Sequence, residues 1–167
     1  MADFVLPGAV ADAGRLCLDC GLCCNGVLFD QVRLMPGDHA KGLTARGLKI
    51  KKSQWFNQPC TALCGSLCQL YRDRPTRCRE FSCRQFQGVA AGEIRFEAAV
   101  ERIAGVREQV RRVEDLLARC GAENERKPLA QRYATALEKS PEGVAASGLE
   151  AAMGLLRGEL EEGFRIC

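Results

Sequence analysis

Cysteine is the residue that most constrains what this chain can fold into. The sequence has 167 residues and 11 cysteines, and nine of the cysteines fall within the first 83 residues. Ordinary core packing does not need sulfur at this density, and an odd total fits a disulfide framework poorly. The cysteines of the first half are therefore the first candidates for function.

The hydropathy of the chain predicts a soluble, cytoplasmic protein. No stretch reaches the ~20 uninterrupted apolar residues of a membrane span, and residues 1–4 lack the basic start and apolar run of a secretory signal. In the reducing cytosol, clustered cysteines are metal ligands or redox groups more often than disulfides. We therefore expect a bound metal ion or cluster and no membrane partner.

The first cysteine cluster consists of Cys17, Cys20, Cys23 and the adjacent Cys24. A spacing of three residues lets a tight loop direct the first three thiols toward one centre, and Gly21 permits a sharp turn there. Successive side chains diverge in most backbone conformations. Cys23 and Cys24 are therefore expected to serve two neighbouring metals, or one metal and one structural role.

The second cluster is spread over more of the chain, as expected for a remote segment that closes a site opened by a compact loop. Eight thiolates can form two four-cysteine sites, or one cluster of three plus one with a second site from the remainder. The sequence leaves this pairing open, and it keeps Cys64 in reserve. The predicted metal ligands are Cys17, Cys20, Cys23, Cys24, Cys60, Cys68, Cys78 and Cys83.

These residues resemble the pattern of a known family. The opening motif is carried by Cys17, Cys20, Gly21, Cys23 and Cys24. The closing run is carried by Pro59, Cys60, Cys68, Tyr71, Arg74, Pro75, Cys78, Arg79, Phe81 and Cys83. The chain is similar here to the bacterial YkgJ-like cysteine-cluster family, described as zinc- or iron-chelating, with the signature C-x-x-C-x-x-C-C. The resemblance covers residues 17–84 and implies metal or iron–sulfur chelation, with Cys64 an addition to the pattern.

The spacing bears on which metal is bound. Three cysteines at a spacing of three plus a remote fourth hold many iron–sulfur clusters, whereas structural zinc sites more often combine two separate C-x-x-C pairs. Only one region here has such pairs. The spacing thus slightly favours an iron–sulfur cluster over Zn²⁺, although thiolate sites accept both.

Three classes of function are consistent with such a site. The first is a redox or electron-transfer module, and the second is a zinc-stapled adaptor that presents its helices to a protein partner. The third is a cluster-dependent protein-modifying enzyme, as one relative in the family, the flagellin lysine methylase, indicates. The sequence supplies no acid–base set that would name a reaction, since His39 is its only histidine.

Charge is distributed unevenly along the chain. Residues 1–88 carry 12 Lys and Arg against 7 Asp and Glu, whereas residues 89–167 carry 12 against 14. Much of the excess flanks two predicted ligands and comes from Arg72, Arg74, Arg77, Arg79 and Arg84. This pattern favours compensation of thiolate charge over an anion or substrate site. Nucleic acid is not an expected partner, because the pI is near 8.3 and few aromatic residues are interleaved with the arginines.

The hydrophobic pattern predicts a single domain over residues 1–167, with a helix-rich α+β fold. The metal-organised, cysteine-rich region spans 17–88 and holds weak strands at 27–29, 32–34 and 48–51, with a short helix following Pro36. A short helix is also expected at 10–16. Residues 92–164 are expected to form a helical hairpin or a three-helix unit. Apolar residues at steps of three and four predict a helix from Phe96 to Cys120, and further helices are expected to begin at Pro128 and at 140–141.

Overall fold

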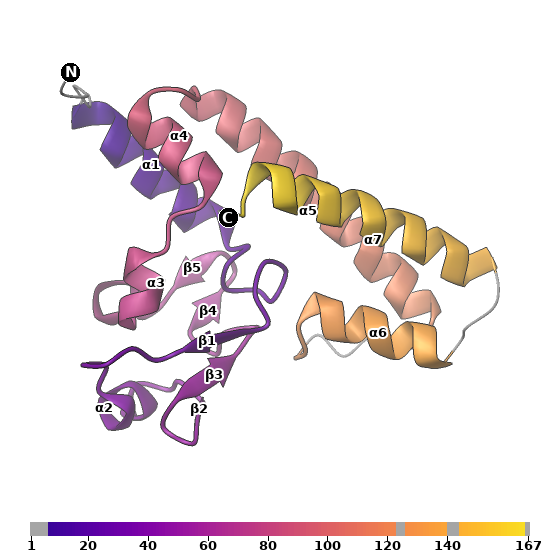
Figure 1. Ribbon diagram of the computed structural model, residues 1–167, viewed down its shortest axis with the longest axis horizontal. Coiled ribbons are helices and arrows are strands. Elements are labelled where there is room, and N and C mark those ends of the chain that lie inside the picture. The colour runs from indigo at the N-terminus through magenta and orange to yellow at the C-terminus, as the bar shows by residue number, and fades with distance from the viewer. Residues whose placement is uncertain (1–6, 123–125, 140–143, 166–167) are drawn as a thin grey trace.

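The computed structural model describes residues 7–122, 126–139 and 144–165. Its architecture is helix-rich α+β, as predicted, with the strands gathered at one end and the long helices at the other (Figure 1). The helices are α1 (Pro7–Cys20), α2 (Ala40–Ala45), α3 (Thr76–Glu80), α4 (Arg84–Ala91), α5 (Phe96–Arg119), α6 (Leu129–Lys139) and α7 (Val144–Gly163), with a 3₁₀ turn at Tyr71–Asp73. The strands are β1 (Gln31–Arg33), β2 (Ile50–Lys51), β3 (Trp55–Asn57), β4 (Leu63–Cys64) and β5 (Leu67–Cys68).

The long helix α5 confirms the prediction from its apolar stripe. Its buried positions follow the predicted steps of three and four, and they pack against α7. Gly121 has a φ of 67°, a left-handed conformation that ends the helix at little steric cost. The helical core comprises Ala13, Leu16, Leu22, Leu28, Val89, Ala99, Ile103, Val106, Val110, Val113, Leu117, Ala122, Leu129, Ala136, Leu149, Ala152, Met153, Leu156, Leu160 and Phe164.

The two remaining long helices complete the predicted three-helix unit. Helix α6 begins directly after Pro128, as predicted. The predicted apolar face of α7 is buried, with Leu149 and Leu156 fully enclosed. The expected start of this helix at 140–141 lies outside the described residues.

The cysteine-rich region has a small core of its own. Strand β3 lies between β1 and β2 in an antiparallel sheet, and β4 pairs with β5 in a separate hairpin. The small core comprises Val32, Leu43, Leu48, Phe56 and Ala62. The sequence therefore placed two of the three expected strands correctly, at 32–34 and 48–51, and the short helix after Pro36 is α2.

The strand expected at 27–29 is wrong. Leu28 points into the helical core, but its backbone N–H donates to the carbonyl of Leu22 at 3.1 Å. The Val27 N–H donates to Oδ1 of Asn25 at 3.1 Å. Because both donors bond within their own turn, this apolar run does not join the sheet.

The first helix is longer than predicted, since α1 runs through Cys17 and Cys20. The three-residue spacing taken as a metal loop also fits one face of a helix, where residues three apart are neighbours. Gly21, with a φ of 69°, then starts the turn that the sequence placed around it.

The end of α7 is tied to the cysteine-rich region. Gln85 is buried and donates from Nε2 to the carbonyl of Gly163 at 2.7 Å. Nη2 of Arg165 donates to the carbonyl of Leu28 at 3.2 Å. These bonds hold the start of α4 and the loop after α1 beside the same helix end (Figure 1). None of the helices in the described part of the chain is long and apolar enough to cross a membrane.

Candidate metal centre

Four cysteines gather where α1 ends and α4 begins. Cys17 and Cys20 lie on the last turns of α1, and Cys23 follows in the turn after Gly21. Cys83 is the N-cap of α4, where its Sγ accepts a hydrogen bond from the Phe86 N–H at 3.5 Å. Because α1 packs against α4, these four cysteines, the first thiol group, share one neighbourhood.

The thiols of the first group repel one another as thiolates. Burial, with the nearby Cys83 and Cys17, raises the pKa of Cys20 to about 11. Burial likewise raises the pKa of Cys23 well above its usual value, with added repulsion from Cys20 and Cys83. Cys17 is exposed as a whole residue, but the protein atoms that shield its thiol, together with Cys83, raise its pKa. Without a cation, these sulfurs therefore stay protonated at neutral pH.

A second group of four forms around the small core. The Cys60 N–H donates to the carbonyl of Cys24 at 2.8 Å, which joins the turn after α1 to the segment before β4. Cys68 lies on β5, and Cys78 lies within α3. We call Cys24, Cys60, Cys68 and Cys78 the second thiol group.

The same physical pattern holds in the second group. Burial, with the nearby Cys60 and Cys68, raises the pKa of both Cys24 and Cys78 to about 12. The pKa of Cys60 is raised by burial and by Cys68, although backbone hydrogen bonds oppose this. Cys60 and Cys68 thus add to the electrostatic cost of ionising Cys24 and Cys78.

The boundary between the groups runs between two adjacent residues. Cys20 and Cys83 raise the pKa of Cys23, whereas Cys60, Cys68 and Cys78 raise that of Cys24. Cys24 also raises the pKa of Cys23, so the two groups adjoin at this pair. The cores divide in the same way. Cys20, Cys23 and Cys83 pack against the helical core, whereas Cys60 and Cys78 pack against the small core.

Phe81 explains how the closing segment reaches both groups. It lies between Cys78 and Cys83 in sequence and packs on the helical core, with its ring edge-on to Phe29 at a centroid distance of 4.9 Å. This anchor fixes the short link between α3 and α4. Cys78 therefore stays with the second thiol group, and Cys83 with the first.

Glycine at position 26 holds the loop that carries Cys24 in place. Its φ is 83°, and a Cβ there would lie 3.1 Å from Cα of Pro128 and 3.2 Å from Cδ of Pro59. Its carbonyl accepts the N–H of Leu129 at 2.9 Å. The loop between the thiol groups is thereby fixed against the start of α6.

The thiol groups are gathered but are not closed into coordination geometry. Within residues 7–122, 126–139 and 144–165, no three Cys, His, Asp or Glu side chains are arranged to hold a metal ion. The donor chemistry nonetheless fits a soft metal, because each group offers four thiols, the number that a four-thiolate zinc or iron–sulfur site uses. Two further cysteines stand apart: Cys64 is exposed on β4, and Cys120 packs against the helical core, as expected of a small core residue.

The arginines of the predicted cluster interact with different groups. Arg74 lowers the pKa of Cys17, Cys24 and Cys78, so it compensates charge in both thiol groups. Arg77 instead donates to Sδ of Met35 at 3.5 Å, and Arg84 donates to the carbonyl of Glu162 at 3.2 Å.

Sequence reasoning missed one member of the site. Arg107 lowers the pKa of Cys20 from α5, a helix far along the chain. It stands on the charged side of an amphipathic helix, where nothing in the sequence distinguishes it from its neighbours.

Residues 16–93 match the model of the CxxCxxCC family, described as a putative zinc- or iron-chelating domain. The match contains both thiol groups and confirms the resemblance drawn from the cysteine spacing. No curated protein and no solved structure matches the chain.

Proposed function

We propose that this protein chelates metal through two separate four-thiolate sites, one formed by each thiol group. The observation that carries the proposal is geometric: the end of α1 with Cys17 and Cys20 packs against α4, which Cys83 caps, whereas the Cys24 carbonyl accepts the Cys60 N–H at 2.8 Å. The family adds the chemistry, zinc or iron chelation.

The electrostatics explain what a metal would do at these sites. Four neighbouring thiolates are unfavourable together because burial and mutual repulsion both oppose ionisation. A bound Zn²⁺ ion or iron–sulfur cluster would supply the positive charge that allows the thiols to ionise. Binding would then draw the sulfurs together, couple metal uptake to local folding and release protons.

The first group is the better candidate for a redox role. Cys17 is exposed on α1, so this site reaches the molecular surface. A cluster held there would be accessible to an electron donor or acceptor. The second group is built around the small core and is better suited to a structural metal.

Metal analysis of matched variants tests the proposal. Protein purified anaerobically is expected to hold metal at both sites. Cys20→Ser is expected to reduce metal at the first site alone, and Cys24→Ser at the second alone. Cys64→Ser is the matched control and should keep the wild-type content, because Cys64 is exposed and outside both groups. Equal losses in all three variants, or unchanged metal in Cys20→Ser and Cys24→Ser, would refute the ligand assignment.

The visible spectrum separates the two metals and their roles. A brown protein that dithionite bleaches indicates an iron–sulfur cluster able to exchange electrons. A colourless protein that holds zinc indicates that the metal stabilises the fold. It would favour the adaptor role, in which the helices bind a protein partner.

A further inference from the structure

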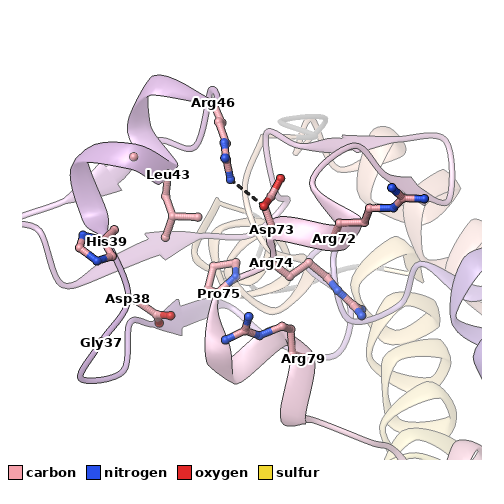
Figure 2. Close-up of a pocket in the computed structure, with 11 residues that line it drawn as sticks. Gly37, Asp38, His39, Leu43, Arg46, Arg72, Asp73, Arg74, Pro75 and Arg79 are labelled. Carbon is pink, nitrogen blue, oxygen red and sulfur yellow. Dashed lines mark ion pairs between the residues drawn. The ribbon is translucent and has the colours of Figure 1, made fainter.

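A cavity of about 350 Å³ lies between α2, the segment before α3, and α3 itself. None of its lining residues is a cysteine, and it adjoins the second thiol group through Arg74 and Asp38. Figure 2 shows Arg46 reaching from α2 toward Asp73, while Arg79 extends from α3 toward Asp38. The lining residues are Gly37, Asp38, His39, Gly42, Leu43, Arg46, Arg72, Asp73, Arg74, Pro75 and Arg79. The volume is at the lower end of the range for small-molecule sites.

The charge of the whole lining is positive. Four arginines stand against two aspartates, which leaves two positive charges in excess, and Arg74 shares its charge with the second thiol group. Figure 2 shows Arg72 pointing away from α2, so the nearer cations are Arg46 and Arg79. An anionic ligand would offset this excess.

The Asp38 carboxylate already accepts hydrogen bonds from protein groups on both of its oxygens. Oδ1 of Asp38 accepts the Thr76 N–H at 2.9 Å and the Thr76 hydroxyl at 2.8 Å, and Oδ2 accepts the Met35 N–H at 2.8 Å. Asp38 therefore serves to fix the start of α3 against the loop before α2. Its hydrogen bonds, rather than Arg79, satisfy its oxygens.

The arginines are held in place by neighbouring groups. Nη1 of Arg46 lies 3.0 Å from Oδ1 of Asp73, and Nη2 of Arg79 donates to Oγ1 of Thr76 at 3.1 Å. Arg74 donates from Nε to the Tyr71 carbonyl at 2.9 Å and stacks its guanidinium over the Tyr71 ring at 3.9 Å. Each of these guanidinium groups keeps further N–H donors. Arginines already oriented lose less conformational entropy when a ligand binds.

We propose that this cavity binds the phosphate group of a small molecule. Arg46 and Arg79 come from different elements and approach from different sides, which suits a tetrahedral phosphate better than a planar carboxylate. Leu43 contributes an apolar wall for the rest of the ligand. The arginine cluster thus has two roles: Arg74 compensates thiolate charge, and Arg46 with Arg79 binds the anion.

The position of the cavity connects it to the second thiol group. Helix α3 carries both Cys78 and Arg79, and Asp38 fixes the start of that helix. A ligand held by Arg79 would therefore contact the element that supplies one thiol of the proposed metal site.

Calorimetric titration with inorganic phosphate tests the proposal, using the purified full-length protein with its metal retained. The wild type is expected to bind one phosphate per chain at 150 mM NaCl, where long-range attraction between exposed charges is largely screened. The double variant Arg46→Gln with Arg79→Gln should weaken binding by about tenfold or more. The double variant Arg112→Gln with Arg119→Gln removes the same charge from α5 and should change binding less than twofold.

The outcomes distinguish a specific phosphate site from nonspecific electrostatic attraction. No phosphate binding by the wild type, or equal weakening in the two double variants, would overturn the proposal. Acetate serves as the second probe, and acetate binding tighter than phosphate binding would also contradict it. Metal content and circular dichroism of each variant confirm that the fold and the thiol groups are intact before titration.

Discussion

The two ends of this molecule are built by different means. The helical end buries long aliphatic side chains from several helices, with Leu117, Leu149 and Leu156 completely enclosed. The cysteine-rich end has a core of five residues, two- and three-residue strands, and thiols at its margin. Hydrophobic burial can account for the first, at ~1.5 to 3 kcal/mol for each large side chain enclosed. The second has too few such side chains to offset the entropy of ordering its loops.

This comparison gives the proposed metals a structural role. Cys60 and Cys78 of the second thiol group pack against the small core, and Cys20, Cys23 and Cys83 of the first pack against the helical core. Metal bound by the thiol groups would stabilise the cysteine-rich end, which hydrophobic burial alone does not stabilise. The helices would then fold without it.

Metal removal should produce the largest difference between the two ends. A structural metal contributes ~10 to 16 kcal/mol in small zinc domains. After treatment with a strong chelator, amide protons in residues 31–80 should exchange rapidly, while those of α5 and α7 remain protected. Hydrogen exchange followed by mass spectrometry measures this. An equal loss of protection in both ends would mean that the comparison is wrong.

Truncation of the helical core should have a smaller effect that does not depend on metal. Leu156→Ala removes a fully buried side chain and should cost ~2 to 5 kcal/mol in free energy of unfolding. Urea denaturation is expected to show the same loss before and after chelation. Phe56→Ala in the small core is the matched comparison, and it should also reduce metal retention. Metal loss in Leu156→Ala alone would contradict the separation of the two ends.

Substitutions at two separate glycines test the junction between the helical end and the cysteine-rich end. Gly26→Ala places a Cβ 3.1 Å from Cα of Pro128 at a φ of 83°, and it should cost ~1 to 3 kcal/mol of stability. Gly105→Ala is the control, because no atom lies within 4 Å of its added Cβ. In the middle of α5 it should stabilise the protein by up to ~1 kcal/mol. Thermal unfolding of the two variants measures these changes. An unchanged melting temperature in Gly26→Ala would contradict this account.

The pH dependence of the metal-free protein should be a smaller effect. Burial raises the pKa of Cys20 to about 11 and that of Cys24 to about 12, from 9.0 in an exposed chain. Because the folded pKa is the higher one, the stabilisation is complete below pH 9 and is lost as pH rises toward 11 to 12. The free energy of unfolding measured in urea from pH 8 to 11 should fall, by on the order of 1 kcal/mol for each of these thiols at pH 10. The variant Cys20→Ala with Cys24→Ala should flatten this fall, and an unchanged slope would argue against buried thiols.

The helical end was more predictable from sequence than the cysteine-rich end. The apolar periodicity from Phe96 and the stop at Gly121 are local signals, and the structure confirms both. The extent of α1 was missed because Cys17 and Cys20 fit a loop motif and a helix face equally well. Strand 27–29 failed because an Asn25 side chain and the Leu22 carbonyl take its donors, which composition does not reveal.

The candidate site follows the same division. The spacing predicted eight thiols as ligands and left their pairing open, because the grouping depends on how α4 and the β4–β5 hairpin fold back. Arg107 and Arg46 come from elements remote from the cysteine motif, so only tertiary structure could bring them to the thiols and the cavity.

Anomalous diffraction from crystals of anaerobically purified protein, recorded at the absorption edge of the bound metal, tests the central claim most directly. Two separate anomalous peaks are expected, one beside Cys23 and Cys83 and the other beside Cys24 and Cys78. A single peak that contacts both Cys23 and Cys24, or sulfurs joined in disulfides with no peak between them, would contradict it.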